Sequence, residues 1–489
     1  MDEKLSVAGG SVRSVTTSDT VHHDKNRVLR TRDDAEGYVA SVCFKHGPPR
    51  LAGVELEWLV HQAATPAAPL DPRTLRTALG PYAPTSLDPG SPARALPGGS
   101  LVTVEPGGQV ELASPPLAPF GTLVRTVIAD STVLHDRLAA HGLAVSPSAA
   151  DAVRPARRVL DLPRYRAMEH RFDRIGAWGR SGMCSTAAVQ VCVDAGEGAD
   201  VAHRWAAVHA LGPVLVAAFA NSPVLHGRRT GWKSSRLAAW LALDPQRTAP
   251  PAPAPGDPAV HWARRVLSTE LLCVRRPDGE WDAPPGVTFA DWIRGSTTLA
   301  GPPTTADLDY HISTLFPPVR PHGHLEVRYL DAQPGRRWAL PAAVLAAVLS
   351  DAATTDRARE ACEPAVGRWE SAARHGLDDR VLQRAAVAVF ELALTALPRL
   401  QPPSWVTADL TVTLERGVRR GLCPADRDGP APHPVGPRLP GPGLASRQSR
   451  GPEPSDPHPA GPAGGTHPAG PAAGGSAAGT ADTPEEARA

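Results

Sequence analysis

Residues 53–60, GVELEWLV, decide the fold class of this chain. Apolar residues occupy every second position and point to one side of an extended segment: Val54, Leu56, Trp58 and Val60. Glu55 and Glu57 point to the other side. A two-residue period is typical of a strand with one buried face. At about 3.3 Å per residue, the two carboxylates lie about 6.6 Å apart along that strand.

The same alternation recurs further along the chain and predicts strands over 101–105 (LVTVE), 109–113 (QVELA), 187–193 (AAVQVCV) and 324–330 (HLEVRYL). Helical spacing of apolar residues predicts helices over 123–143, 201–219, 339–351, 356–375 and 380–397. Strands and helices come in blocks, without regular strand–helix–strand alternation. This favours an α+β fold with an antiparallel sheet flanked by helices.

The polar faces of these strands are rich in acid and contain no lysine. They carry Glu55, Glu57, Glu105, Glu111 and Glu326, together with Gln190 and Arg328. Glu105 comes just before a turn predicted at Pro106 and two glycines. If the strands share one sheet, these carboxylates converge, and their repulsion favours a bound cation such as Mg²⁺ or Mn²⁺. Mg²⁺ held by carboxylates usually carries nucleotide phosphates.

A simpler interpretation stays open for each strand, because the outer face of an antiparallel sheet is normally polar and solvated. A nucleotide site would also need cations for the phosphates. Candidates are Arg328, Arg320, Arg164 and the run 228–236 (RRTGWKSSR). The sequence contains no P-loop, no dinucleotide-binding GxGxxG after a strand, no GxSxG and no HExxH, which argues against those common templates.

Composition gives no support for several function classes. The 51 basic and 50 acidic residues give a formal net charge of +1, so charge does not indicate nucleic-acid or membrane binding. Six scattered cysteines without a CxxC pair indicate reduced thiols. The N-terminal residues lack the apolar core of a secretory signal, and the apolar stretch over about 205–220 is interrupted by His209 and Pro213 and is too short to span a bilayer. We therefore expect a cytoplasmic protein with no evident protein partner.

Proline accounts for 54 of the 489 residues, about twice its usual share of roughly 5%. Much of the excess lies in 424–489, a Pro/Gly/Ala-rich segment with too few large apolar side chains to offset the entropy of folding. We expect a disordered tail there, a flexible N-terminal segment over 1–35, and one folded body over 36–423. The run 249–258 (APPAPAPGDP) predicts a surface loop.

Between about residues 50 and 350 the chain resembles the glutamate–cysteine ligase family, in its plant and bacterial branch. The resemblance is carried by GVELEWLV (53–60), TVEPGGQVELASPP (103–116), RYRAM (164–168), FANSPVLHG (219–227), WKSSR (232–236), HISTLFPPVR (311–320) and HLEVRYLD (324–331). Within that family, the pattern is most similar to the bacterial enzymes of ergothioneine biosynthesis.

The resemblance implies a curved antiparallel sheet of the glutamine synthetase type, with ATP and Mg²⁺ on its concave face. The implied reaction joins the γ-carboxylate of L-glutamate to L-cysteine through γ-glutamyl phosphate, which yields γ-glutamylcysteine, ADP and phosphate. It makes 36–423 the catalytic domain, with small molecules as its partners. Another ligase on the same scaffold, joining glutamate to a different amine, would show nearly the same motifs and remains an alternative.

The resemblance also assigns roles to residues. It implies metal ligation by Glu55, Glu57, Glu105, Glu111 and Glu326. Arg328 and Glu326 would be the catalytic residues, with Arg328 in contact with phosphate in the transition state. Arg236, Arg164 and Tyr165 would bind substrate. Asn221 and Ser222 fit either a turn that shapes the pocket or a direct contact, whereas His311 fits a structural role.

Overall fold

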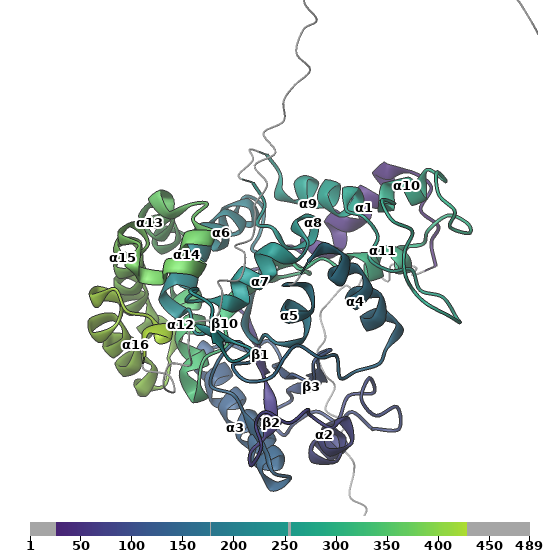
Figure 1. The fold of residues 1–489 in the computed structure, drawn as a ribbon. Helices are drawn as coiled ribbons and strands as arrows, with labels where there is room; N and C mark the ends of the chain where they lie inside the picture. Colours follow the sequence, from purple (N-terminus) through teal and green to yellow (C-terminus); the bar gives the residue numbers. More distant parts are fainter. Residues whose placement is uncertain (1–25, 177, 253–255, 428–489) are drawn as a thin grey trace, which may run out of the picture. The chain divides into compact units, whose positions relative to one another are not determined.

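The computed structural model describes residues 26–176, 178–252 and 256–427, all within one compact unit, Met1–Gly443. Its main sheet has six strands in the order β3-β4-β1-β6-β10-β9, and every neighbouring pair is antiparallel. The α+β fold with an antiparallel sheet flanked by helices is thereby confirmed (Figure 1).

The strands are β1 Ala52–Trp58, β2 Val60–Gln62, β3 Leu101–Val104, β4 Val110–Ala113, β5 Leu143–Val145, β6 Ala188–Val193, β7 Val224–Leu225, β8 Arg228–Arg229, β9 Val319–Pro321 and β10 Leu325–Asp331. The helices are α1 Arg32–Cys43, α2 Pro72–Leu79, α3 Phe120–Ala140, α4 Pro163–Ile175, α5 Trp178–Cys184, α6 Asp200–Phe219, α7 Ser235–Leu243, α8 Pro245–Thr248, α9 Pro258–Ser268, α10 Phe289–Ile293, α11 Thr305–Ile312, α12 Ala339–Val348, α13 Ala352–Cys362, α14 Trp369–His375, α15 Arg380–Ala396 and α16 Ser404–Arg416.

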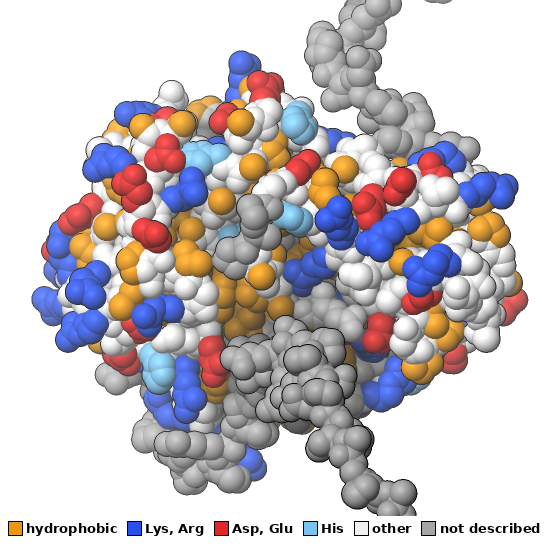
Figure 2. All heavy atoms as spheres, turned by 90° about the horizontal axis from the view of Figure 1, so that it is seen from above, with side chains coloured by type: hydrophobic (Ala, Val, Ile, Leu, Met, Phe, Trp, Pro, Cys, Tyr) orange, Lys and Arg blue, Asp and Glu red, His pale blue; other side chains and the backbone are white. Residues whose placement is uncertain are grey.

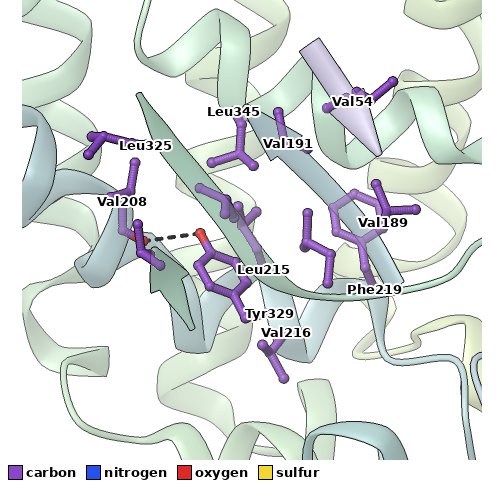
Figure 3. Packing of buried hydrophobic residues seen from close by; sticks show 14 of the residues in the cluster. Val54, Val189, Val191, Val208, Leu215, Val216, Phe219, Leu325, Tyr329 and Leu345 are labelled. Atoms are coloured by element: carbon purple, nitrogen blue, oxygen red, sulfur yellow. Dashed lines mark hydrogen bonds between the residues drawn. The ribbon is translucent and has the colours of Figure 1, made fainter. Parts of the chain in front are cut away.

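One face of the main sheet is apolar and forms the centre of the core. Figure 3 shows sheet residues meeting side chains from α6 and α12: Val54, Val189, Val191, Leu325 and Tyr329 from the sheet, Val208, Leu215, Val216 and Phe219 from α6, and Leu345 from α12. The Tyr329 hydroxyl donates to the Val208 carbonyl at 3.1 Å, which satisfies its polar end within the core. Because this face is covered by helices, the opposite face carries the polar side chains.

Helices gather around the sheet in separate groups (Figure 1). α13 and α16 both contact α15, and α1 contacts α9 and α11. A third group, α4, α5 and α7, carries several of the predicted site residues: α5 contacts α4 and α7, and α7 contacts β10. α4 begins with Pro163, whose missing N–H would have no partner in the first turn. α7 begins after Ser234, whose side chain accepts from the Leu237 N–H.

Two predicted elements are divided in the structure. The strand expected over 53–60 ends at Trp58, and Val60 begins β2, which pairs with β5 in a separate two-stranded sheet. The prediction of a single helix over 356–375 is wrong. It is interrupted between α13 and α14, where Pro364 lies in a 3-10 turn and Gly367 has a φ of +79°. Proline and a positive φ both end a helix, and periodicity alone does not detect them.

The folded part is slightly longer than expected at both ends. Residues 1–25 lie outside the described residues, but Leu29 is buried and α1 begins at Arg32, upstream of the predicted boundary at 36. At the other end, a 3-10 turn over Pro424–Asp426 buries Ala425, so the body continues past 423. The rest of the predicted tail, 428–489, lies outside the described residues.

Among the described residues, one unbroken helical stretch, Arg380–Leu400, is long and apolar enough to cross a membrane, and 56% of its most apolar window is buried inside the protein. It contains α15, which contacts α6, α12, α13 and α16, as a core helix does. All six cysteines are free thiols, as predicted. On the face drawn in Figure 2, acidic and basic side chains are interspersed, in keeping with the small net charge.

Candidate active site

The polar face of the sheet brings acids from neighbouring strands together. Glu57 on β1 stands directly opposite Glu111 on β4, and Thr103 on β3 stands opposite Glu111 from the other side. The Thr103 hydroxyl donates to Glu111. The two carboxylates therefore lie side by side because of strand register, although 54 residues separate them in sequence.

Gln190 joins these two carboxylates from β6. Its Nε2 donates to Glu57 Oε1 at 2.8 Å and to Glu111 Oε1 at 3.2 Å, and Glu57 also accepts from the Ala188 N–H at 2.8 Å. The Gln190 side chain is buried, and its Oε1 has no hydrogen-bond partner among the described residues. A buried acceptor without a donor is unusual and suits a cation or a substrate N–H.

Glu326 on β10 lies between two arginines. Arg320 on β9 is its register partner and donates to both carboxylate oxygens, at 2.7 and 3.0 Å, and Arg328 donates to the same carboxylate. Burial alone would raise the pKa of Glu326, but the two guanidinium groups lower it to about 2. Glu326 is therefore ionised, and it holds Arg328 on the same face of the sheet as Glu55 and Glu57.

Glu105 is carried by the tight turn that the sequence predicts between β3 and β4. The Gly108 N–H donates to the Glu105 carbonyl at 2.8 Å, and Gly108 has a φ of +83°. A Cβ on Gly107 would come within 2.2 Å of the Cys184 carbonyl oxygen, so only glycine allows the turn to pack against the end of α5. The predicted turn at Pro106 is thereby confirmed.

Three of the carboxyl groups are held in an environment that disfavours their charge. Burial raises the pKa of Glu111 well above its usual value, with further contributions from Glu105, Glu55 and Glu57. Burial and the Glu57 charge raise the pKa of Glu105 to about 7. The pKa of Glu55 is also raised, by burial and by Glu326. These acids influence one another, so they form one electrostatic cluster.

The three predicted substrate residues adjoin this cluster. Tyr165 has its pKa raised by burial and by the Glu105 charge, and Arg164 in turn acts on Glu105. Arg164 donates to the Ser313 hydroxyl and carbonyl, both at 2.8 Å, and lies over the Tyr310 ring. Arg236 on α7 is buried, and its Nη2 donates to the Arg328 carbonyl at 2.7 Å.

The predicted metal-binding acids share a face but are not arranged as a finished metal centre. Among the described residues, no three His, Cys, Asp or Glu side chains converge as ligands of one ion. Each of three acids is engaged by protein donors instead: Glu57 by Gln190, Glu111 by Thr103, and Glu326 by Arg320. The available donors are oxygen atoms, the kind that Mg²⁺ and Mn²⁺ prefer.

Comparison with known proteins shows which family has this chain as a member. The family profile described as glutamate-cysteine ligase family 2 matches residues 51–428, most of the chain. The chain belongs to glutamate–cysteine ligase family 2. It is 39% identical over 405 residues to the protein named glutamate–cysteine ligase EgtA of Mycobacterium tuberculosis, covering 80% of this chain and 88% of that protein. The protein of the same name from Mycolicibacterium smegmatis is 42% identical over 339 residues, which cover 68% and 78% of the two chains.

Among solved structures, the chain aligns with a glutamate–cysteine ligase from Francisella tularensis in complex with AMP. The TM-score is 0.45 and the identity 12%, over 78% of this chain and 84% of that chain.

Sequence reasoning missed several polar residues on and around the face of this family member. The sequence patterns give Thr103 no role and suggest Arg320 as a phosphate contact, whereas the structure places Thr103 on Glu111 and Arg320 on Glu326. Asp331 and Ser234 stand out in the sequence only as parts of motifs, and in the structure they lie behind Arg236. The tight turn predicted between 101–105 and 109–113 could have indicated the pair Thr103–Glu111, whereas no local pattern specifies that β1 or β6 lies beside β4 or β10.

The residues of uncertain role are now placed. His311 is buried, its Nε2 lies 2.9 Å from the Val266 carbonyl, and burial lowers its pKa to about 3. Its Nδ1 has no hydrogen-bond partner among the described residues, so the structural role stays a prediction. The Asn221 amide donates to the carbonyls of Pro147 and Ala332, and Ser222 donates to Asp331. These contacts favour a turn that shapes the site.

Proposed function

We propose that this chain is an ATP-dependent glutamate–cysteine ligase whose product enters ergothioneine biosynthesis. It would join the γ-carboxylate of L-glutamate to the amine of L-cysteine by way of γ-glutamyl phosphate, and release γ-glutamylcysteine, ADP and phosphate. Family membership and the two mycobacterial relatives named EgtA support this proposal. The observation that carries it is the sheet face on which Glu57, Glu111 and Gln190 adjoin the Arg320–Glu326–Arg328 group.

Mg²⁺ fits the residues on this face. Glu55, Glu57, Glu105, Glu111 and Glu326 would hold it. The fit rests on an oxygen-only donor set, on the unpartnered Gln190 Oε1, and on the convergence of Glu55, Glu105 and Glu111, whose pKa values are raised by burial and by one another's or neighbouring carboxylate charge. When bound, the metal would supply charge neutralisation for the β- and γ-phosphates of ATP.

The residues of the chain would then stabilise charge and fix geometry. Arg328, held by Glu326, presents a guanidinium group to the transferring phosphoryl group and to the later tetrahedral intermediate. Arg320 donates two hydrogen bonds to Glu326, so Glu326 stays ionised. The ionised carboxylate then holds Arg328 in one orientation. Such positioning supplies most of the catalysis in phosphoryl transfer, because the protein forms no covalent bond.

The amino-acid substrate would lie against α4 and α7. Arg236 would bind the α-carboxylate of glutamate through guanidinium N–H groups that the protein leaves unpartnered. Arg164 and Tyr165, on α4, would also line the substrate site. Ser313 and the Tyr310 ring fix the guanidinium group of Arg164. In this proposal no cysteine acts as a nucleophile, because the acyl phosphate makes one unnecessary.

The test is direct. The purified full chain is incubated with ATP, Mg²⁺, L-glutamate and L-cysteine, and γ-glutamylcysteine is sought by mass spectrometry while phosphate release is followed. We expect one phosphate per γ-glutamylcysteine. Phosphate release that does not depend on cysteine would overturn the acceptor assignment. A panel of other amines in place of cysteine tests the alternative, a ligase for a different amine.

Two further proposals accompany this function. Residues 428–489 take no part in catalysis, so a chain that ends at residue 427 is expected to keep full turnover. The enzyme acts on small molecules in the cytoplasm, with no role for nucleic acid or membrane and with no protein partner evident. Cell fractionation with an antibody to the full chain tests that location.

A further inference from the structure

Asp331, the last residue of β10, sits at the centre of a buried polar network behind Arg236. Its Oδ2 accepts from the Ser222 hydroxyl at 2.7 Å and from the Asn221 N–H at 2.8 Å, and its Oδ1 accepts from the Ser234 hydroxyl at 2.7 Å. The Asp331 side chain is almost fully buried. Residues from the FANSP, WKSSR and EVRYLD motifs therefore meet at one carboxylate.

Both serine hydroxyls act as donor and acceptor at once. Ser222 Oγ accepts from the Arg236 N–H at 3.1 Å, and Ser234 Oγ accepts from the Leu237 N–H at 3.1 Å. Because each hydroxyl proton goes to Asp331, the oxygen lone pairs are left to receive the N–H groups of the first turn of α7. The carboxylate therefore fixes the start of α7 to the end of β10, and Arg236 lies in that first turn.

The guanidinium group of Arg236 is only partly used by the protein. Nη2 donates to the Arg328 carbonyl, and Nη1 lies 3.9 Å from Asp331 Oδ1, too far for a hydrogen bond. Among the described residues, Nε and Nη1 are both buried without a hydrogen-bond partner. Buried guanidinium donors are rarely left unsatisfied in this way, so these two indicate a ligand.

Asp331 compensates the positive charge of Arg236 without a hydrogen bond to its guanidinium group. Its two oxygens accept from Ser222, Ser234 and Asn221, and Nη1 of Arg236 stays 3.9 Å from Oδ1. The buried N–H groups on Nε and Nη1 are therefore left for a ligand.

We propose that Asp331 is a positioning residue for Arg236: through Ser222 and Ser234 it holds the start of α7 so that the guanidinium N–H groups that the protein leaves unpartnered are available to the amino-acid substrate. This inference deepens the proposed function and rests on it for the identity of the amino acid. Asp331 itself does not touch the substrate. The three motifs occur together because they build one support for one arginine.

Asp331→Asn tests the inference. Asparagine keeps the size of the side chain but loses the charge, and its amide cannot accept the hydrogen bonds of both serines and Asn221. We expect the KM for L-glutamate to rise roughly tenfold, as befits the loss of a charged hydrogen-bond network. The KM for ATP and kcat should change less than about threefold, since Arg236 acts in binding. Asp278→Asn, at an exposed position, is the matched control.

Circular dichroism and the thermal midpoint establish whether the variant is folded. If Asp331→Asn does not fold, Ser222→Ala removes one arm of the network and should shift the same constant in the same direction by a smaller factor. An unchanged KM for glutamate in a folded variant overturns the inference. An equal rise in both KM values also overturns it, because that indicates general loss of structure.

Calorimetric titration of L-glutamate separates this inference from the proposed function. If the wild-type chain binds glutamate but forms no γ-glutamylcysteine, the proposed function fails, and weaker glutamate binding by Asp331→Asn still supports the positioning role. If wild-type protein does not bind glutamate at all, with or without ATP and Mg²⁺, the inference is wrong.

Discussion

Glu57 and Glu111 face each other across β1 and β4, and both carboxylates accept from the single Nε2 of Gln190. Glu57 accepts one further hydrogen bond from a backbone N–H, and Glu111 one from the Thr103 hydroxyl. Two adjacent acids with only neutral donors between them repel one another whenever both are ionised. Without a bound metal, the pair is therefore stable only when it does not carry both negative charges.

Glu111→Gln is expected to stabilise the metal-free protein while it impairs the enzyme. The substitution removes one of the two facing charges, but an amide oxygen can still accept from Thr103. In chelator at pH 8, the thermal midpoint should rise by about 2 °C or more. Formation of γ-glutamylcysteine with Mg²⁺ should fall at least about tenfold. Glu360→Gln, exposed on α13, should change neither quantity. A less stable Glu111→Gln protein would show that the pair is not repulsive.

The metal-free protein should become less stable as the pH rises from about 5 to 8. Burial and Glu57 raise the pKa of Glu105 to about 7 from 4.5. A group with a raised pKa in the folded state contributes stability that is complete below 4.5 and is lost as the pH passes 7. The lowered pKa of Glu326, about 2, acts only in more acidic solution. Urea unfolding in chelator at several pH values measures the slope, which Glu105→Gln should flatten. A profile that is identical in this variant contradicts the assignment.

Local sequence patterns predicted the polar face of the sheet well, but they did not predict contacts between residues that lie far apart in the sequence. The two-residue period of 53–60 put Glu55 and Glu57 opposite Val54 and Leu56, and burial of both apolar side chains confirms this. Alternation is a property of one strand and can be recognised in the sequence of that strand alone.

The order of the strands and the positions of the loops cannot be recognised in this way, because they depend on contacts between separate segments. Arg320 contacts Glu326 because β9 forms a hairpin with β10; the two residues lie only six apart in sequence, but β9 has three residues and is too short to show the alternation that predicts a strand. Asp331 meets Ser222 and Ser234 through loops that lie about a hundred residues away along the chain. Helix α7 was not predicted either, since its nine residues are apolar on most sides and show little periodicity.

Arg328→Lys should lower kcat by about a hundredfold, the usual loss when one donor to a developing negative charge is removed. Lysine keeps the charge but lacks the planar fork that lets arginine contact Glu326 and phosphate together. The KM for glutamate should change little, because Arg236 contacts the Arg328 carbonyl rather than its side chain. Arg357→Lys on the exposed side of α13 is the control. Steady-state kinetics with varied glutamate measure both kcat and the KM for glutamate. A kcat within twofold of wild type would mean that Arg328 takes no part in the reaction.

Gln190→Leu should destabilise the metal-free protein by about 2 kcal/mol, because it leaves two carboxylates without the amide that both use. The effect depends on their charge, so it should shrink in the Glu57→Gln/Glu111→Gln background, where the neighbours are neutral. Urea unfolding at pH 8 in chelator, for all four proteins of this cycle, gives the coupling free energy directly. A penalty of equal size in both backgrounds would mean that Gln190 serves the packing of β6 alone. A coupling above about 1 kcal/mol would identify Gln190 as the link that keeps two opposed acids together before the metal arrives.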